Sequence, residues 1–334
     1  MRRLKPVRAA FIGFGNVGRA LVEEAVNTGW LAIASVSSSR GSVIVRGRKD
    51  LSELVGLASN GARLDSHSSF EQLDPVDAAT ESGASVAFVA LPPSYETGEP
   101  NRSIYRRLAS SSIDIVTADK TVLALEYGAF MSYAYSLGIR VGYNATVAAG
   151  TPVLSLARSL RGRGVRLVRG VLNATSNYLV SMVEKGLSWM EALDRARDEK
   201  LVEPDPRIDT HGWDAAAKLA IILSVLGEEA SIRDVYREPL IGKVGEEEVR
   251  RAHSKGERLR YVAEADIAQG EYRVYPVILR ENDPLARVEG ARNCVVFEVE
   301  GDTIVVEGPA GPAWRTARVM IADALEIAAE NTRS

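Results

Sequence analysis

A turn with three glycines, placed between a short apolar run and an amphipathic segment, constrains this chain more than any other feature. Residues 7–12 have the composition of a buried strand, and residues 17–26 show helical spacing of apolar side chains. Gly13 permits a tight turn, Gly15 lets a pyrophosphate approach the backbone, and Gly18 allows close packing of the helix. The whole loop consists of Gly13, Phe14, Gly15, Asn16, Val17 and Gly18. The sequence therefore predicts a dinucleotide site at a helix N-terminus, and the alternative is a tight turn without a ligand.

Strand-like and helical patterns alternate along the first 140 residues. Further strands are expected at residues 31–36, 86–90, 113–117 and 139–143, with helices at residues 104–109 and 126–137. Alternation of this kind is typical of parallel β-α-β units. We therefore expect an α/β, Rossmann-like, doubly wound cofactor domain in this part of the chain.

The pattern changes after residue 144. Strands are expected at residues 165–172, 272–279 and 294–299, and a helical block at residues 177–226. Ser188 and Glu191 form a capping-box pattern at the start of one helix, and Gly227 marks the end of another. This mixture predicts a second, α+β domain. A last helix at residues 316–329 belongs either to this domain or to the first.

Charge and cysteine content narrow the class of protein. The chain has 334 residues, with 41 Lys and Arg against 44 Asp and Glu, so its net charge of −3 provides no field that attracts nucleic acid or an anionic membrane. No run approaches the roughly 20 apolar residues of a membrane span. Cys294 is the single cysteine and has no partner for a disulfide, which favours a reducing cytoplasm. Chemistry on a small molecule is the remaining expectation.

The choice of coenzyme depends on the segment after the second strand. An acid about 20 residues after the glycines would accept the ribose 2′-hydroxyl of NAD, but residues 25–49 contain no Asp or Glu. Three serines instead lead to Arg40, whose guanidinium suits a 2′-phosphate. NADP is therefore expected in preference to NAD, with Arg48 and Lys49 as candidate second contacts. The alternative is that Arg40 is a solvated loop charge.

Two lysines stand out because the chain uses eight lysines against 33 arginines. A retained lysine is a candidate for a residue that must lose its proton. Lys120 follows the predicted strand at residues 113–117, at the sheet edge where ligands gather in open α/β folds. Lys218 lies four residues after Asp214, a spacing that also fits an ordinary exposed ion pair on a helix.

An acidic loop precedes Lys218. Its four carboxylates belong to Glu203, Asp205, Asp209 and Asp214. Pro204 and Pro206 stiffen this loop, so it is expected to bind a cationic group, with a substrate ammonium favoured. Chelation of a metal by Asp205, Asp209 and His211 is the alternative, although the spacing matches no known site.

The chain resembles the homoserine dehydrogenases in its motifs, from the glycine loop to the last helix. Besides residues 13–18 and Thr117-Ala118-Asp119-Lys120, the matching segments are residues 143–152, 172–178, 203–218 and 308–323. The resemblance implies reversible conversion of L-homoserine into L-aspartate 4-semialdehyde with NAD(P), in threonine and methionine biosynthesis. The chain ends at residue 334, where longer members carry a regulatory domain, so threonine feedback through such a domain is not expected.

The family's functional residues fall on particular positions of this chain. Lys218 and Lys120 match the catalytic lysines, with Lys218 as first choice for proton transfer. The substrate-binding residues are matched by Thr175, Glu203, Asp209 and Asp214. The glycine loop, Arg40, Thr117 and Lys120 would contact the coenzyme. Backbone carbonyls of Asn144, Val147, Ala149 and Thr151 match the family's site for a sodium-like cation.

The resemblance also implies an arrangement of domains and subunits. The last helix would rejoin the cofactor domain, giving residues 1–140 with 305–334 as the dinucleotide-binding domain and residues 141–304 as the substrate-binding and dimerisation domain. A cytoplasmic homodimer is therefore expected.

The chain departs from the family at several positions. Asp119 stands where Asn is usual, Asn144 where Glu is usual, and Ala174 where Gly is usual. The segment Thr210-His211-Gly212-Trp213 also replaces a more apolar or acidic stretch. A negative charge at Asp119, beside Lys120, predicts an unusual pH optimum or rate.

Two rival functions remain open. The first is a Rossmann oxidoreductase that acts on another small substrate. A dehydrogenase that needs a nucleophilic cysteine is disfavoured, because Cys294 lies in an apolar strand-like run and reads as a core residue. The second is an NADP-binding protein with little or no turnover, which the retention of both lysines and Glu203 disfavours.

Overall fold

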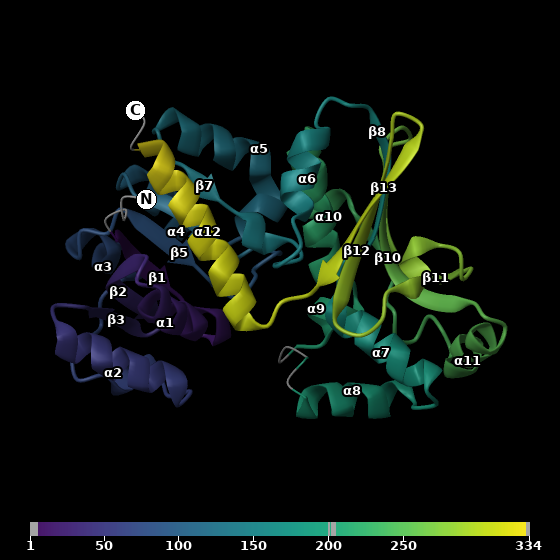
Figure 1. The fold of residues 1–334 in the computed structure, drawn as a ribbon, viewed down its shortest axis with the longest axis horizontal. Coiled ribbons are helices and arrows are strands. Elements are labelled where there is room, and N and C mark those ends of the chain that lie inside the picture. The colour runs from purple at the N-terminus through teal and green to yellow at the C-terminus, as the bar shows by residue number, and fades with distance from the viewer. Residues whose placement is uncertain (1–5, 200, 202–204, 332–334) are drawn as a thin grey trace. The chain divides into compact units, whose positions relative to one another are not determined.

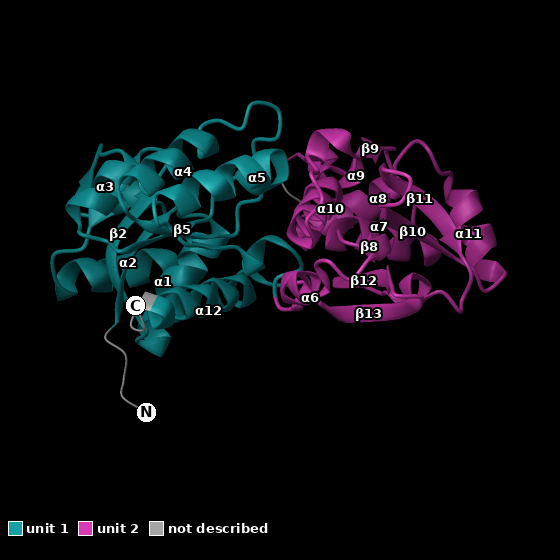
Figure 2. Ribbon diagram, turned by 90° about the horizontal axis from the view of Figure 1, so that it is seen from above, with its two compact units in different colours: residues 1–149, 311–334 teal, residues 150–310 magenta. Residues whose placement is uncertain are grey.

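The computed structural model describes residues 6–199, 201 and 205–331. The chain forms two compact units, shown in different colours in Figure 2. Unit 1 consists of residues 1–149 and 311–334, and unit 2 consists of residues 150–310. The first unit is therefore built from both ends of the chain, and the second from one continuous segment.

Unit 1 contains a seven-stranded sheet with the order β4-β3-β2-β1-β5-β6-β7. Its strands are β1 (Val7–Ile12), β2 (Leu31–Ser38), β3 (Gly41–Ile44), β4 (Phe70–Glu71), β5 (Val86–Val89), β6 (Asp114–Thr117) and β7 (Val141–Gly142). Five neighbouring strands pair in parallel, in the order β2, β1, β5, β6 and β7. The strands β3 and β4 are antiparallel additions at one edge. The expected Rossmann-like, doubly wound sheet is thereby confirmed.

Helices pack on both faces of this sheet (Figure 1). One face carries α1 (Asn16–Thr28), α2 (Arg48–Ser59) and α12 (Ala313–Asn331), and the other carries α3 (Pro75–Glu81), α4 (Asn101–Ser110) and α5 (Thr121–Ser136). The short helices are η1 (Leu64–Ser66) and η2 (Asn144–Thr146). Because α12 contacts α1, β1, β6 and β7, the C-terminal segment is part of unit 1.

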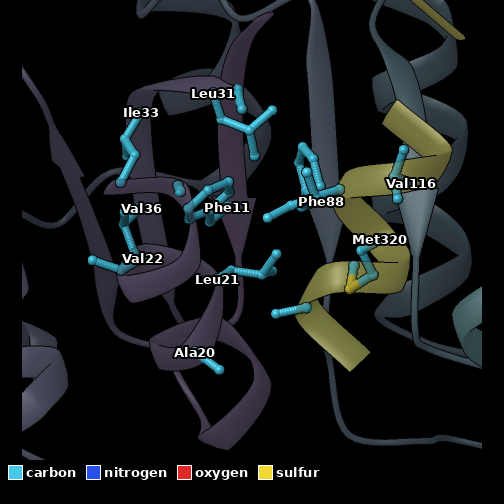
Figure 3. Packing of buried hydrophobic residues seen from close by; sticks show 14 of the residues in the cluster. Phe11, Ala20, Leu21, Val22, Leu31, Ile33, Val36, Phe88, Val116 and Met320 are labelled. Atoms are coloured by element: carbon cyan, nitrogen blue, oxygen red, sulfur yellow. The ribbon is translucent and has the colours of Figure 1, made fainter. Parts of the chain in front are cut away.

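Successive side chains of β1 point to opposite faces of the sheet, and Ala9 and Phe11 face the core beneath α1 and α12. Figure 3 shows Phe11 of β1 among side chains of α1, β2 and β5, with Met320 of α12 in the same cluster. Phe11 and Phe88 meet edge to face, with ring centroids 5.3 Å apart. Truncating a fully buried Phe to Ala typically costs about 3–5 kcal/mol, so Phe11 anchors this half of the unit.

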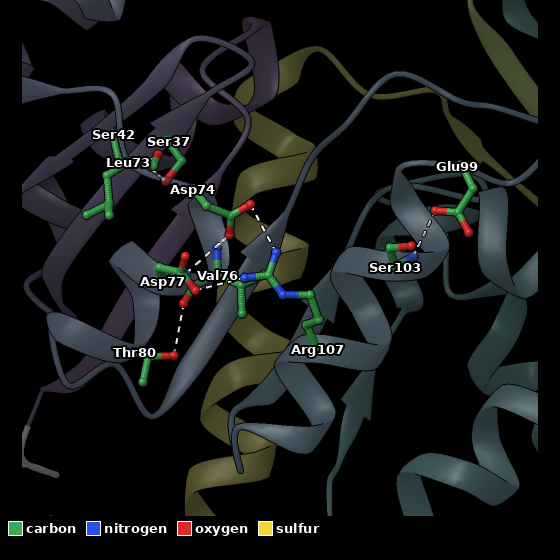
Figure 4. Close-up of polar contacts among 10 residues, drawn as sticks. All are labelled: Ser37, Ser42, Leu73, Asp74, Val76, Asp77, Thr80, Glu99, Ser103 and Arg107. Carbon is green, nitrogen blue, oxygen red and sulfur yellow. Dashed lines mark hydrogen bonds and ion pairs between the residues drawn. The ribbon is translucent and has the colours of Figure 1, made fainter.

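On the other face, an arginine joins two helices (Figure 4). Arg107 of α4 donates to Asp74 at 3.0 Å and to Asp77 at 2.7 Å. Asp74 also accepts from the backbone of Val76 and so caps α3. Because these side chains are partly exposed, each ion pair contributes at most about 1 kcal/mol, but together they fix the contact between α3 and α4.

Unit 2 contains a six-stranded sheet with the order β13-β12-β8-β10-β11-β9. Its strands are β8 (Val165–Val171), β9 (Tyr236–Arg237), β10 (Arg258–Asp266), β11 (Glu271–Leu279), β12 (Arg292–Val299) and β13 (Asp302–Pro309). Neighbouring strands are antiparallel except for β11 and β9. This is the expected mixed α+β unit.

Helices of unit 2 contact the sheet through α7, α10 and α11, which all touch β10. The helices are α6 (Val153–Leu160), α7 (Ala174–Glu184), α8 (Trp189–Asp198), α9 (Arg207–Thr210), α10 (Trp213–Leu226) and α11 (Glu246–Ser254). The short helices η3 (Ile232–Asp234) and η4 (Pro284–Arg287) complete the unit.

A separate core gathers Leu285 of η4 with Val171, Val262 and Cys294, so Cys294 is a buried core residue as expected. Burial raises the pKa of the Cys294 thiol to about 12, which leaves it a poor nucleophile.

The capping signals of the sequence are confirmed. Ser188 and Glu191 form the capping box of α8, and Gly227 ends α10 with a left-handed backbone. The boundaries between the units differ from the expected ones, because the divisions fall after residues 149 and 310 rather than 140 and 304. Asn144 bonds to Asp323 of α12 and holds residues 141–149 in unit 1. In unit 2, β13 continues to Pro309.

Candidate active site and coenzyme site

The glycine loop has the geometry that a pyrophosphate requires. Gly13 has φ +110°, and a Cβ there would lie 2.2 Å from the carbonyl oxygen of Ala90. A Cβ on Gly18 would lie 1.8 Å from the carbonyl oxygen of Gly13, whereas a Cβ on Gly15 would meet no atom within 4 Å. No side chain caps α1, which begins at Asn16. The backbone N–H groups of its first turn and the space at Gly15 therefore fit a phosphate group.

The end of β2 lies beside this loop. The N–H of Gly13 donates to the carbonyl oxygen of Ser37 at 2.9 Å. Arg40 follows in the turn between β2 and β3, and its Nη1 donates to Asp65 Oδ2 at 2.8 Å. Arg63 also donates to Asp65, from Nε at 3.0 Å and from Nη2. Arg40 is therefore not an isolated loop charge, because it shares a carboxylate with a second arginine.

The loop after β6 is organised by a buried threonine. Thr117 is fully buried, and its Oγ1 bonds to the Tyr105 hydroxyl, accepts from the N–H of Asp119 at 2.9 Å and donates to the Asp119 carbonyl at 3.1 Å. Thr117 therefore shapes the loop that follows β6, and its contact with the coenzyme stays a prediction. Lys120, half-buried, follows this turn and precedes α5.

Asp119 is buried and is held by the residue that follows Lys120. Its Oδ1 accepts from the N–H of Thr121 at 3.0 Å and from the Thr121 hydroxyl at 2.7 Å. Its Oδ2 has no hydrogen-bond partner within the described part of the chain. Burial raises the pKa of the Asp119 carboxyl, and the bonds from Thr121 oppose this only in part. Burial therefore makes the carboxyl of Asp119 harder to ionise than that of an exposed aspartate.

In unit 2, an asparagine amide brings two aspartates together. Asn173 Nδ2 donates to Asp209 Oδ1 at 2.6 Å and to Asp214 Oδ2 at 2.8 Å. Lys218 Nζ lies 2.7 Å from Asp214 Oδ2 and donates to the carbonyl oxygen of Leu172 at 2.6 Å. The side chains of Asp214 and Lys218 are each 14% exposed. The exposed helix pair considered for these two residues is therefore excluded, because they belong to a largely buried network.

The elements of unit 2 explain why this network forms. Asn173 is the N-cap of α7, where its Oδ1 accepts from the N–H of Ser176 at 2.7 Å, so its amide group is left to donate toward α9 and α10. Asp214 and Lys218 lie one turn apart on α10. The Thr175 hydroxyl donates to the carbonyl oxygen of Leu201 at 2.8 Å and ties α7 to the segment after α8.

One of the carboxylates of the acidic loop is paired with an arginine of the same loop. Arg207 donates to both carboxylate oxygens of Asp205 and lowers the pKa of that carboxyl to about 2. The negative charge of Asp205 is therefore already balanced by the positive charge of Arg207. Glu203 lies outside the described residues. Over the ranges that the structure describes, no group of three or more His, Cys, Asp and Glu side chains has the arrangement of a metal site.

A family model for homoserine dehydrogenase matches residues 152–325, which is more than half of the chain. The chain belongs to the homoserine dehydrogenase family. The resemblance found in the sequence motifs is thereby confirmed. As a member of this family, the chain is an NAD(P)-dependent oxidoreductase.

Individual relatives agree with this assignment. A homoserine dehydrogenase from Sulfurisphaera tokodaii is 31% identical over 314 residues, which cover 92% of this chain and 94% of that protein. An NAD(+)-dependent homoserine dehydrogenase from Pseudomonas canavaninivorans is 29% identical, covering 98% of this chain and 97% of that protein.

Solved structures of homoserine dehydrogenases share the fold. A crystal structure described as a homoserine dehydrogenase from Archaeoglobus fulgidus has a TM-score of 0.83 and 26% identity, covering 96% of this chain and 99% of that one. A hyperthermophilic archaeal homoserine dehydrogenase in complex with NADPH has a TM-score of 0.82 and 23% identity, covering 97% and 98% of the two chains.

Two departures from the homoserine dehydrogenase pattern have physical explanations. Asn144 donates from Nδ2 to Asp323 Oδ1 at 2.7 Å and from its backbone to Asp323 Oδ2 at 2.9 Å, so a glutamate at residue 144 would place two carboxylates together. Gly212 has φ +76°, and a Cβ there would lie 2.6 Å from the Tyr261 hydroxyl. Nothing in the structure explains Ala174, which starts α7.

The carbonyls expected to bind a cation fall in a single stretch of chain. Asn144 starts η2, and Val147 and Ala149 follow it in unit 1. Thr151 lies at the start of unit 2. Val147 and Thr151 are buried, and Asn144 is half-buried.

Asn173 and Asp65 are the residues that the sequence reasoning missed. Asn173 belongs to the motif at residues 172–178, but its spacing from Asp209 and Asp214 gives no signal of contact. Its position before Ala174-Thr175-Ser176 does carry a helix N-cap signal, which would have fixed where its oxygen points.

In the described ranges, no helix is long and apolar enough to cross a membrane.

Proposed function

We propose that this chain catalyses the reversible NAD(P)-dependent conversion of L-homoserine into L-aspartate 4-semialdehyde, with NADP as the preferred coenzyme. The observation that carries the proposal is the network in which Asn173 holds Asp209 and Asp214 while Asp214 pairs with Lys218. Membership of the homoserine dehydrogenase family supports this reaction and its place in threonine and methionine biosynthesis.

Lys218 is the residue to which we assign proton transfer. Alcohol oxidation needs a group that takes the hydroxyl proton while the bound nicotinamide accepts a hydride. Lys218 Nζ is anchored by Asp214 and by the Leu172 carbonyl, so its position is fixed before substrate arrives. In the oxidation direction its amine takes the hydroxyl proton, and in the reduction direction its ammonium returns it.

Asp209 and Asp214 would bind the α-ammonium of the amino acid, together with Thr175 and Glu203. Asp209 and Asp214 are held close together by one amide, which makes a compact negative site. A cationic ammonium suits this site better than a neutral alcohol does, because two carboxylates that share one amide donor retain a net negative charge. Binding the ammonium there would fix the reacting carbon relative to Lys218.

Lys120 is proposed to orient the substrate and to share in proton transfer. It follows the carboxyl end of β6, at the sheet edge where ligands bind in open α/β folds. The buried turn built on Thr117 and Asp119 holds the backbone that presents it.

The coenzyme would bind along the edge formed by the glycine loop and the end of β2. The contacts assigned to it are Gly13, Phe14, Gly15, Asn16, Val17, Gly18, Arg40, Thr117 and Lys120. Preference for NADP rests on Arg40 and on the absence of an acid in residues 25–49. The related structure in complex with NADPH supports this choice, whereas the NAD(+)-dependent relative makes it a question for measurement.

The remaining parts of the proposal are a monovalent cation, a homodimer and a cytoplasmic location. The cation would be held by carbonyls of Asn144, Val147, Ala149 and Thr151. The dimer is supported by β13, an eight-residue edge strand on which Val305 is 45% exposed. The cytoplasm is supported by the single, buried Cys294.

Initial rates of L-homoserine oxidation with NADP and with NAD, on purified protein, test this function. We expect formation of the reduced coenzyme and of the semialdehyde, with a higher kcat/KM for NADP. Coenzyme binding without turnover by either coenzyme would contradict the enzyme and favour a binding protein. Turnover of another alcohol at a higher kcat/KM would contradict the substrate.

A further inference from the structure

Asp65 lies between two exposed arginines near the β2–β3 turn. Asp65 Oδ2 accepts from Arg40, and both of its oxygens accept from Arg63. The Asp65 side chain is 23% exposed, whereas those of Arg40 and Arg63 are 57% and 62% exposed. The single carboxylate of Asp65 therefore balances one of the two positive charges. An anion in solution can reach both guanidinium groups, because they are exposed.

This cluster lies close to the glycine loop. Ile12 and Ser37 are register partners in the β1–β2 pair, and the Ser37 carbonyl accepts from the N–H of Gly13. Arg40 is three residues further along, so its backbone lies within roughly 10 Å of the Ser37 backbone. The adenosine ribose of a dinucleotide bound at the carboxyl end of β2 falls in this region.

Arg63 is better placed as a second cation than Arg48 or Lys49. It shares Asp65 with Arg40, so the two guanidinium groups converge on one point. Arg48 and Lys49 begin α2 after Gly47. Among the residues that the structure describes, no hydrogen bond or ion pair joins either of them to Arg40, Arg63 or Asp65.

We propose that Arg63 is the second cation of the 2′-phosphate site and that Asp65 limits how strongly this site prefers a phosphorylated coenzyme. The inference rests on the proposed coenzyme site and names two residues that set its specificity. A 2′-phosphate carries a charge of about −1.5 to −2 at neutral pH, which two arginines together can match. Asp65 competes with the phosphate for the same N–H donors and repels it. Removing that charge should therefore strengthen binding of the phosphorylated form.

Titration calorimetry with 2′,5′-ADP and with 5′-AMP tests this directly, because the two nucleotides differ only by the 2′-phosphate. The variants are Arg63→Gln, which removes the proposed cation, and Asp65→Asn, which keeps size and an acceptor oxygen but removes the charge. Arg46→Gln is the matched control, since Arg46 follows β3 at the end away from the turn, is 61% exposed and pairs with Glu71. Thermal unfolding of each variant confirms that it is folded.

We expect Arg63→Gln to weaken 2′,5′-ADP binding about three- to tenfold and Asp65→Asn to strengthen it by a similar factor. Binding of 5′-AMP should stay within about twofold in both, and Arg46→Gln should change neither. Unchanged 2′,5′-ADP binding in Arg63→Gln, weaker binding in Asp65→Asn, or parallel changes with 5′-AMP would overturn the inference. Wild-type protein that binds neither nucleotide would overturn the proposed coenzyme site as well, whereas normal wild-type discrimination with unaffected variants overturns this inference alone.

Discussion

The arginine cluster of unit 1 and the amide-centred network of unit 2 arrange charge in opposite ways. Arg40 and Arg63 are more than half exposed and meet one carboxylate. Asp209 is 5% exposed, and Asp214 and Lys218 are 14% exposed at the side chain. Water and salt screen the first group, but the second is held by its own hydrogen bonds. Charges in the first region should therefore adjust affinity, and those in the second should decide whether the reaction occurs.

The largest effect is expected from Lys218→Ala. Loss of the group assigned to proton transfer should lower kcat for homoserine oxidation by about 10²- to 10⁴-fold while the Kd for NADPH stays nearly constant. Initial rates and fluorescence titration measure the two quantities. Lys185→Ala, which removes an exposed lysine at the end of α7, is the control. A kcat within threefold of wild type would remove Lys218 from the mechanism.

Asn173→Asp should have the next largest effect. The introduced carboxylate can still cap α7, but it cannot donate to Asp209 and Asp214, so kcat/KM should fall about 10- to 100-fold. Activity should recover partly toward acidic pH, where protonation of the introduced carboxylate restores one donor, and pH profiles of kcat/KM measure this.

Asn177→Asp provides a matched comparison on the same helix. Asn177 Nδ2 donates to the carbonyls of Val288 and Gly290 and not to the network. This variant should lower the midpoint of thermal unfolding but retain the pH profile of wild type. Equal loss of kcat/KM in both variants would mean that Asn173 acts only through stability.

Arg40→Gln should have a smaller effect that depends on salt. The Kd for NADPH should rise about tenfold at low ionic strength, and the Kd for NADH should hardly change. Raising the salt concentration should reduce the difference between wild type and variant, because the side chain is exposed. A loss that persists at high salt would show that the arginine cluster behaves like the buried network.

The smallest effect on activity is expected from Asp119→Asn, because an asparagine oxygen can accept the same two hydrogen bonds from Thr121. The raised pKa of the Asp119 carboxyl means that the folded state binds the proton more tightly than the unfolded state does. The free energy of unfolding of wild type should therefore fall as pH rises above about 4, by at most about 1.4 kcal/mol per pH unit, relative to the variant. Chemical denaturation between pH 4 and 8 measures this, and parallel pH dependence in both proteins would contradict it.

Local signals in the sequence predicted much of this molecule. The glycine loop, the capping box at Ser188 and the five parallel strands of unit 1 depend on residues close together in the chain, and the structure contains them. The antiparallel strands β3 and β4 were not predicted. The sequence did not predict the strand β10. It carries Arg260, which is buried and pairs with Glu184 of α7, so the pattern of the strand is not apolar. A buried charge in a strand needs hydrogen-bond partners, and here the carboxylate among them lies 76 residues away in the chain.

The two charge clusters were only half visible in the sequence. The spacing of Asp214 and Lys218 suggested a pair, but Asn173 is 41 residues before Asp214, and only the fold brings them together. Likewise, Asp65 is 25 residues after Arg40. The identity of a charged side chain is a property of the sequence, whereas its partner is a property of the tertiary structure.

The helix α12 has a consequence for the synthesis of the chain. Met320 and Ile321 belong to the same core cluster as Phe11 and Leu21. During translation, the first 149 residues therefore lack part of their core until the last helix leaves the ribosome, whereas the continuous unit of residues 150–310 is released earlier. The segment made first completes its fold last, and until then the apolar side chains that α12 covers remain accessible to water.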